Sequence, residues 1–262
     1  MKKYYKMAAA AMQVQTSYSA WYWASTFSTI VRLLIMYFFW KAVYANQHSI
    51  QDMNLESMLT YIVVAMFLQM FVSGVGKELV STIKDGNVAI ELMRPYDLIL
   101  KLIALDFGGK FMFLIREALP LAVLSIFFLD ISLPGSLGSA VLFLFSAFCG
   151  IWIGTFLDLL IAILAFWTVN VWGLEVLKES VISFFSGALV PIILFPGWFQ
   201  EISQFLPFQA MVYVPVSIYT GIISGTQVYT MIGIQLFWML AMYFSLRIIW
   251  SLALRKVTIF GG

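Results

Sequence analysis

A chain of 262 residues in which 62% are hydrophobic and 11% are charged lacks the polar surface of a soluble globular domain, in which about 25% of the residues are charged. The net charge of +2 and the scattered Lys and Arg residues exclude a basic nucleic-acid-binding face, and the single cysteine, Cys149, excludes an intrachain disulfide and a metal–thiolate cluster. The composition therefore predicts an all-α polytopic membrane protein.

The first segment, residues 1–21, carries Lys2, Lys3 and Lys6 and then Tyr18 and Trp21. This order is typical of an interfacial helix that lies at the headgroup level and leads into a membrane span. A disordered basic tail is the alternative. We expect the segment to be retained, because the apolar run after the lysines is too short and too weak for a signal peptide.

Six later stretches are long and apolar enough to cross about 30 Å of hydrocarbon as helices. Together they make one six-span unit, residues 22–262. In span four, Gly150 and Gly154 form a GxxxG pattern, which predicts close helix packing. The spans are placed near residues 22–44, 57–76, 107–129, 137–166, 172–195 and 227–249.

The distribution of positive charge predicts the orientation of the spans. Most Lys and Arg residues, with Lys178 counted among them, are assigned to the segments before span one, between spans two and three, between spans four and five, and after span six. The segments 45–56, 130–136 and 196–226 contain none. Because positive residues stay in the cytoplasm, both termini are expected there.

A polar stretch, residues 77–97, lies between spans two and three. Its first part has the apolar spacing of a short helix, Asp85-Gly86 indicates a turn, and Asn87 is suited to cap a second helix over Val88 to Met93. Pro95 ends that helix, since the residue before a proline avoids the helical conformation. We predict a compact cytoplasmic element that docks a partner protein; an ordinary solvated loop is the alternative.

The run Gly74-Val75-Gly76-Lys77 is not a phosphate-binding loop. The position of the upstream glycine is occupied by Phe71, and Glu78 follows the lysine where Ser or Thr is required. We therefore expect any ATP to be bound by a separate chain.

Prolines interrupt the apolar region between spans five and six. A seventh span over 202–220 is one alternative, but it would place Arg255 and Lys256 on the outer side, against the charge rule. We predict instead an external re-entrant hairpin over 191–226, which must be covered by protein or water and is expected to cap a passage. Its candidate site residues are Pro191, Pro196, Trp198 and Pro207.

The run Ile83-Lys84-Asp85-Gly86-Asn87-Val88-Ala89-Ile90-Glu91-Leu92-Met93-Arg94-Pro95 and the later run Phe185-Ser186-Gly187-Ala188-Leu189-Val190-Pro191, followed by Phe195-Pro196-Gly197-Trp198-Phe199, occur in a characteristic order. They resemble, respectively, the coupling-helix region and the re-entrant hairpin of ABC type-2 exporter permeases. The resemblance covers essentially the whole chain and is closest to the bacterial subgroup often encoded as two related permeases plus one ATPase.

The resemblance implies a transport subunit and not an enzyme. Two permeases, identical or related, would pair in the bacterial plasma membrane among its lipids, with ATP and Mg bound by partner ABC ATPases and no cofactor or nucleic acid bound by this chain. The expected activity is efflux of an amphipathic or lipid-like substrate such as a drug, an antimicrobial peptide or a glycolipid. The implied ATPase-docking residues are Ser81, Lys84, Asp85, Gly86, Asn87, Glu91 and Arg94. The implied substrate path, for which lipid-facing packing is the alternative, comprises Phe67, Met70, Phe71, Phe184 and Phe185.

Four charged residues are expected deep within the predicted spans, about 12 to 15 Å from their assigned cytoplasmic ends: Arg32, Arg116, Glu117 and Asp158. An unpaired charge there costs at least about 2.5 to 3.5 kcal/mol, so we expect ion pairs or contact with water, with Arg32 and Asp158 as the preferred pair. Either a structural ion pair or a direct role with substrate or protons is consistent with this pattern.

A different function, an ion-coupled secondary transporter, would use Asp158 and Glu117 as ion sites. Such proteins often contain inverted repeats with paired broken helices, whereas this chain has one proline-broken region, in its second half. His48 is the only histidine, which argues against a histidine metal site and against histidine-based intramembrane catalysis.

Overall fold

The computed structural model describes residues 2–16, 19–51, 53–72, 74–129, 131–168 and 171–256. These residues form helices and their connections, with one isolated β-bridge between Ile50 and Met53. The helices up to the docking region are α1 (Lys2–Thr16), α2 (Ser19–Val43), the 3-10 helix η1 (Tyr44–Asn46), α3 (Leu55–Val72), α4 (Gly76–Lys84) and α5 (Val88–Leu92). They are followed by α6 (Leu98–Phe113), the π-helix η2 (Leu114–Ala118), α7 (Leu119–Phe128), α8 (Leu137–Ile163), η3 (Leu164–Phe166), α9 (Trp172–Phe185), η4 (Ile192–Leu194), α10 (Gly197–Gln204), α11 (Tyr213–Thr220) and α12 (Thr226–Leu254).

The predicted all-α fold is confirmed. Within the described residues, five helical stretches are long and apolar enough to cross a membrane, and each overlaps one of the predicted spans. They are Tyr22–Asn46, Leu55–Lys84, Leu98–Phe128, Leu137–Phe166 and Thr226–Leu254.

The continuous helix predicted over 172–195 is not formed. Helix α9 ends at Phe185 and, with 14 residues, is about 21 Å long. The chain turns at Gly187, whose φ of +77° is unfavourable for residues with a side chain, and Pro191 then interrupts the backbone hydrogen bonding that a continued helix would need. The prediction extended the helix to residue 195 because the stretch is apolar throughout, and apolar composition alone does not indicate a turn.

Two tyrosines satisfy the backbone groups exposed by this turn. The Tyr61 hydroxyl on α3 donates to the Gly187 carbonyl at 2.8 Å, and the Tyr213 amide at the start of α11 donates to the Ser186 carbonyl at 2.9 Å. Such partners are required wherever irregular backbone lies at membrane depth.

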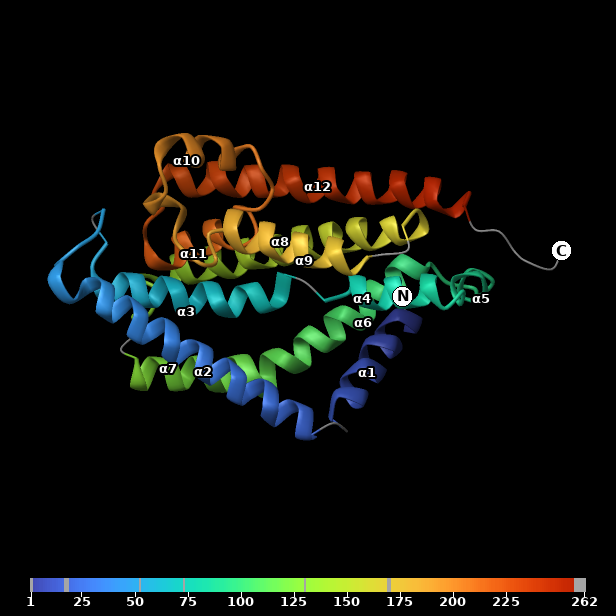
Figure 1. Ribbon diagram of the computed structural model, residues 1–262, viewed down its shortest axis with the longest axis horizontal. Coiled ribbons are helices and arrows are strands. Elements are labelled where there is room, and N and C mark those ends of the chain that lie inside the picture. Colours follow the sequence, from blue (N-terminus) through green and yellow to red (C-terminus); the bar gives the residue numbers. More distant parts are fainter. Residues whose placement is uncertain are drawn as a thin grey trace.

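The region predicted as a hairpin, 191–226, contains η4, α10 and α11. It lies at the end of the molecule opposite α4 and α5 (Figure 1). Buried Gln235 of α12 attaches it to the bundle: its amide donates to the Ala210 carbonyl at 2.8 Å and to the Ser146 carbonyl at 3.2 Å, and it accepts from the Ser146 hydroxyl at 2.9 Å. The hairpin is therefore anchored to both α8 and α12.

Glycines of α8 allow two other segments to approach it closely, as the GxxxG pattern predicted. A Cβ at Gly154 would lie 2.4 Å from the Val72 carbonyl oxygen of α3, and one at Gly150 would lie 2.5 Å from the Met211 carbonyl oxygen. Helix α8 is thus packed at backbone distance against the end of α3 and the segment that precedes α11.

Helix α1, the predicted interfacial helix, packs along α6, where the Ala8 carbonyl lies over Gly108. Figure 1 shows the start of α1, both α4 and α5, and the end of α12 at one end of the molecule. This arrangement places the start of α1 and the end of α12 at the same end of the molecule; the cytoplasmic location of both termini stays a prediction.

Candidate functional site

The predicted docking stretch forms a compact unit, residues 76–96, which we call the docking element. Helix α4 turns Leu79 and Val80 inward, and α5 does the same with Val88. These three side chains join a core that also contains Leu98 of α6 and Leu159 of α8. Burial of this apolar face, expected from the helical spacing, attaches the docking element to the membrane helices.

The opposite side of the docking element is exposed. Apolar Ile90, Leu92 and Met93 are exposed there, with Met93 at 75% of its full accessibility. The resemblance assigned the docking role to the stretch from Ser81 to Met93, which contains these three, but they were not named among the candidate contacts, although large apolar side chains beside a charged turn were a usable signal. Beside them lie the predicted docking residues Ser81, Lys84, Asp85, Gly86 and Asn87, which are exposed as well.

The turn between α4 and α5 differs from the prediction in its capping. Asn87 makes no side-chain cap and has helical backbone angles, φ −69° and ψ −13°, whereas a capping residue needs an extended conformation. Gly86 makes the reversal, with φ +72°, and the Ser81 hydroxyl donates to the Asp85 carboxylate at 3.0 Å. Helix α5 then ends at Leu92, one residue earlier than predicted.

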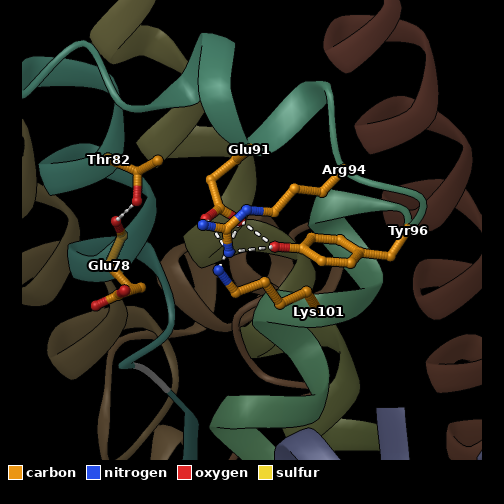
Figure 2. Close-up of polar contacts among 6 residues, drawn as sticks. All are labelled: Glu78, Thr82, Glu91, Arg94, Tyr96 and Lys101. Carbon is orange, nitrogen blue, oxygen red and sulfur yellow. Dashed lines mark hydrogen bonds and ion pairs between the residues drawn. The ribbon is translucent and has the colours of Figure 1, made fainter. Parts of the chain in front are cut away.

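Glu91 lies at the centre of a polar cluster that connects α5 to the start of α6 (Figure 2). Its carboxylate contacts Lys101 of α6 at 2.6 Å and Arg94 at 3.2 Å, and it accepts from the Tyr96 hydroxyl at 2.6 Å. Burial alone would raise the pKa of Glu91, but the hydrogen bonds from Lys101 and Tyr96 and the charges of Lys101 and Arg94 bring that pKa below its ordinary value. Glu91 is therefore held inside the element, whereas the Arg94 side chain is about half exposed.

Asp97 ties the end of the docking element to two distant helices. Its carboxylate caps α6 by accepting from the Leu100 amide at 2.9 Å and pairs with Arg247 of α12 at 2.7 Å. Its amide donates to the Tyr4 hydroxyl of α1 at 3.0 Å. The first and last described helices, α1 and α12, thus both contact the residue that follows the docking element.

The connection from α3 into α4 is held by a side chain from another helix. The Oδ2 atom of Asp158 on α8 accepts the Gly76 amide at 2.7 Å and the Gly74 amide at 3.0 Å. Its other oxygen, Oδ1, pairs with Lys178 of α9, and both side chains are almost fully buried. We call this arrangement the joint. A Cβ at Gly76 would lie 3.0 Å from Asp158, so glycine permits the close approach.

A second buried ion pair flanks the joint. Lys110 and Asp106 of α6 are paired at 2.5 Å, and Lys110 also donates to the Thr155 hydroxyl of α8 at 3.0 Å. The Asp106 carboxylate lies 3.4 Å from where a Cβ at Gly74 would be. Helices α6, α8 and α9 therefore all place charged groups around the start of α4.

The predicted ion pair between Arg32 and Asp158 is wrong. Asp158 is occupied by Lys178 and two amides, and Arg32 is exposed on α2. The error arose because Lys178 was assigned to a cytoplasmic segment, whereas α9 carries it inward. No local pattern indicated which face of this short helix would be buried.

The two other charged residues that were assigned to spans, Arg116 and Glu117, lie in the π-helix η2. The Arg116 guanidinium stacks on the Tyr22 ring at 4.4 Å, and the Tyr22 hydroxyl donates to the Arg116 carbonyl at 2.7 Å. Buried Glu117 accepts from the hydroxyl groups of Thr29 at 3.0 Å and Ser25 at 3.4 Å. These contacts join α2 to the bulged helix.

The predicted substrate-path residues lie in different surroundings. Phe71 is buried against Phe113 of α6, with ring centroids 5.1 Å apart, while Phe67 and Met70 are half-buried. Phe184 and Phe185 belong to an aromatic cluster with the hairpin. The other rings of that cluster are Phe195, Phe199 and Phe208.

The hairpin candidates divide in the same way between the interior and the surface. Pro191 and Pro207 are buried, whereas Pro196, which precedes α10, and Trp198 are exposed.

Comparison with known families gives one match. Residues 30–261 match the family described as ABC-2 family transporter protein. A search of curated proteins found no match. The matched region includes the docking element, the joint and the hairpin. Members of this family are membrane components of transporters that associate with an ABC ATPase. The chain therefore belongs to the ABC-2 transporter family, as the resemblance of its two motifs indicated.

Proposed function

We propose that the chain is the permease subunit of an ATP-driven exporter and that the docking element is the surface that receives the ATPase. The proposal rests on the contrast between the exposed side and the buried side of the docking element. Ile90, Leu92 and Met93 are exposed beside the charged turn, whereas the start of α4 is held in the buried joint. A solvated loop would need neither feature.

The joint suggests how movement of an ATPase would reach the membrane helices. Because Asp158 holds the start of α4 and is itself paired with Lys178, displacement of α4 would pull on α8 and α9 together. Helix α9 leads directly into the hairpin at the opposite end of the molecule. This chain's contribution is mechanical, with ATP hydrolysed on the partner.

A cavity beside the joint supports an amphipathic or lipid-like substrate. It has a volume of about 680 Å³ and lies between α1, α4 and α6. Its wall is mainly apolar, but the ion pair of Asp106 and Lys110 and the carboxylate of Glu78 also line it. A mainly apolar cavity with a few charged groups suits a molecule that has both an apolar body and a polar group. We propose export as the direction, in keeping with the resemblance noted in the sequence.

The docking proposal is tested by measuring binding of an ABC ATPase from the same organism to the purified chain in nanodiscs. Met93→Asp should weaken binding at least tenfold, because it places a charge in the apolar contact, whereas Met93→Leu should bind normally. Both variants should show wild-type thermal unfolding, since Met93 is exposed. Normal binding by Met93→Asp, or transport in vesicles driven by an ion gradient without any ATPase, would overturn the proposal.

A further inference from the structure

Another cavity lies at the end of the molecule opposite the docking element. It has a volume of about 660 Å³ and is bordered by the end of α2, the start of α3 and the end of α7 with the segment that follows it. Figure 1 shows these three helix ends at the end of the molecule where the hairpin also lies. Because α2, α3 and α7 belong to helical stretches of span length, the cavity lies near the headgroup level of the leaflet opposite the docking element.

The inner wall of this cavity is apolar. Its side chains are buried or half-buried, and they are Leu55, Leu59, Ile126, Leu129 and Ile131. Water makes no hydrogen bonds with such a wall, so an apolar chain is the more favourable occupant. At the edge of a membrane the acyl chains of lipids supply that occupant.

The segment that closes the cavity is held by two other elements. The Thr60 hydroxyl of α3 accepts the Ser132 amide at 3.1 Å, and the two hydroxyl groups lie 3.0 Å apart. The Tyr219 hydroxyl of α11 donates to the Ser132 carbonyl at 3.2 Å. The wall is therefore fixed to α3 and to the hairpin, and the cavity is part of the folded structure.

The rim of the cavity carries one charged group of each sign. Lys41 of α2 and Glu56 of α3 are both exposed, and both line the cavity. Among the described residues, neither has an ion-pair partner within 4.0 Å, and the two do not pair with each other. The Lys41 ammonium lies 5.6 Å from the centre of the Tyr37 ring, so it is held beside another residue of the cavity wall.

These charges determine which lipid fits. A phosphatidylethanolamine headgroup carries an anionic phosphate and, at its tip, an ammonium group with N–H donors. Lys41 offers a cation to the phosphate, and Glu56 offers an anionic acceptor to the ammonium. Phosphatidylglycerol has a net negative headgroup that Glu56 would repel, and the choline of phosphatidylcholine has no N–H to donate.

We propose that this cavity binds one phosphatidylethanolamine molecule, with its phosphate at Lys41, its ammonium at Glu56 and one acyl chain against the apolar wall. Within the described part of the chain, no residue lines both this cavity and the cavity beside the joint. Because the wall is hydrogen-bonded to Tyr219, the bound lipid connects the hairpin to the surrounding leaflet.

The test counts lipid adducts on the purified full chain by native mass spectrometry after addition of phosphatidylethanolamine, phosphatidylglycerol or phosphatidylcholine with identical acyl chains. The wild-type chain should bind one phosphatidylethanolamine about tenfold more tightly than either of the other lipids, because only this headgroup makes a charge-assisted hydrogen bond to Glu56. Lys41→Gln and Glu56→Gln should each remove the preference. Soluble glycerophosphoethanolamine should not compete, because it lacks acyl chains, and competition by it would overturn the proposed lipid site.

The decisive variant is Glu56→Lys. It places a second cation on the rim, so the preference should reverse toward phosphatidylglycerol, and a misfolded chain would not produce such a reversal. Glu201→Lys adds the same charge at an exposed position on α10, at the same end of the molecule but outside the cavity. It should keep the wild-type preference, and a reversal in both variants would assign the effect to net charge and overturn the proposal.

Equal binding of the three lipids by the wild-type chain would also overturn the proposal, as would a preference that survives both neutral variants. Loss of the adduct when the chain self-associates would assign this face to a partner subunit instead. Thermal unfolding of each variant should match that of the wild type, since Lys41 and Glu56 are exposed. Because no ATPase takes part in this assay, its failure is separate from a failure of ATPase docking.

Discussion

The carboxylate of Asp158 accepts the backbone amide of Gly76 at 2.7 Å, so that a side chain of α8 occupies the place of an N-terminal cap on α4. A negative charge is favourable at this position, because the first amides of a helix lack partners and carry partial positive charge. The run Gly74-Val75-Gly76-Lys77, which lacks the residue pattern of a phosphate-binding loop, thus binds an anionic side chain of the protein itself.

Removing the lysine of the joint should destabilise the protein. Lys178→Met leaves the Asp158 carboxylate buried without its ion-pair partner, which should lower the free energy of unfolding by about 3 to 5 kcal/mol. The double variant Asp158→Asn, Lys178→Met removes both charges and should recover part of the loss. Thermal unfolding in detergent measures each effect. The exposed Lys77→Met serves as the control, and an equal loss there would show that the joint is not responsible.

A methyl group at Gly76 should disturb the joint without altering charge. Gly76→Ala places a Cβ 3.0 Å from the Asp158 carboxylate and backbone, so α4 must shift at a cost of about 1 to 3 kcal/mol. We expect reduced stability together with weaker ATPase activation. Gly173→Ala on α9 is the matched control, because its Cβ meets no atom within 4 Å, and it should be neutral or slightly stabilising. Identical behaviour of the two variants would contradict the close packing.

Acid should loosen the docking element through Glu91. The pKa of Glu91 in the folded protein lies below its ordinary value of 4.5, so the ionised form stabilises the fold above that pH. This contribution is lost as the pH falls below 4.5 toward the lower pKa of the folded state. Protection of residues 85–97 against hydrogen exchange, corrected for the intrinsic exchange rate at each pH from 7 to 3, should therefore decrease at the acid end.

The substitution Glu91→Gln should show faster exchange already at pH 7, because Lys101 and Arg94 lose their charged partner, and should respond less to acid. Glu78→Gln, at an exposed position on α4, should follow the wild type. An acid response that survives in Glu91→Gln would assign the effect to other groups.

The hairpin should detach locally when its buried amide is removed. Gln235→Met retains the volume of the side chain but leaves the Ala210 carbonyl and the Ser146 hydroxyl without this partner, at about 1 to 3 kcal/mol for each unsatisfied group. Faster hydrogen exchange across residues 186–225 is the expected result. Gln204→Met, at an exposed site on α10, should exchange like the wild type. Global unfolding with uniform exchange would argue that Gln235 supports the whole bundle and not the hairpin in particular.

Local patterns in the sequence were enough for several features of the fold. Apolar length located five stretches that span-length helices occupy, and the glycine spacing of α8 predicted its close contacts. The apolar spacing of α4 and the stop signal near Pro95 predicted the docking element. These features depend on neighbouring residues, as helix formation, burial of one face and termination by proline do.

Features that depend on side-chain contacts between different elements or turns were missed. Glu91 was assigned to the partner surface, but Lys101 and Tyr96 draw it inward. Helix α9 was predicted to continue to 195, but it ends at Phe185, where Tyr61 of α3 supports the turn. None of these three partners could be identified from the residues next to the feature it determines.

By itself, the sequence determined that this is an all-helical membrane protein of the ABC-2 transporter type with a compact docking element after its second span. The tertiary structure alone decided which buried charges meet. Asp158 lies 20 residues from Lys178 and more than 80 from Gly74 and Gly76, and the four come together only because α8 packs at backbone distance against α3. Apolar length is a property of each helix, whereas the partner of a buried charge depends on how the helices face one another.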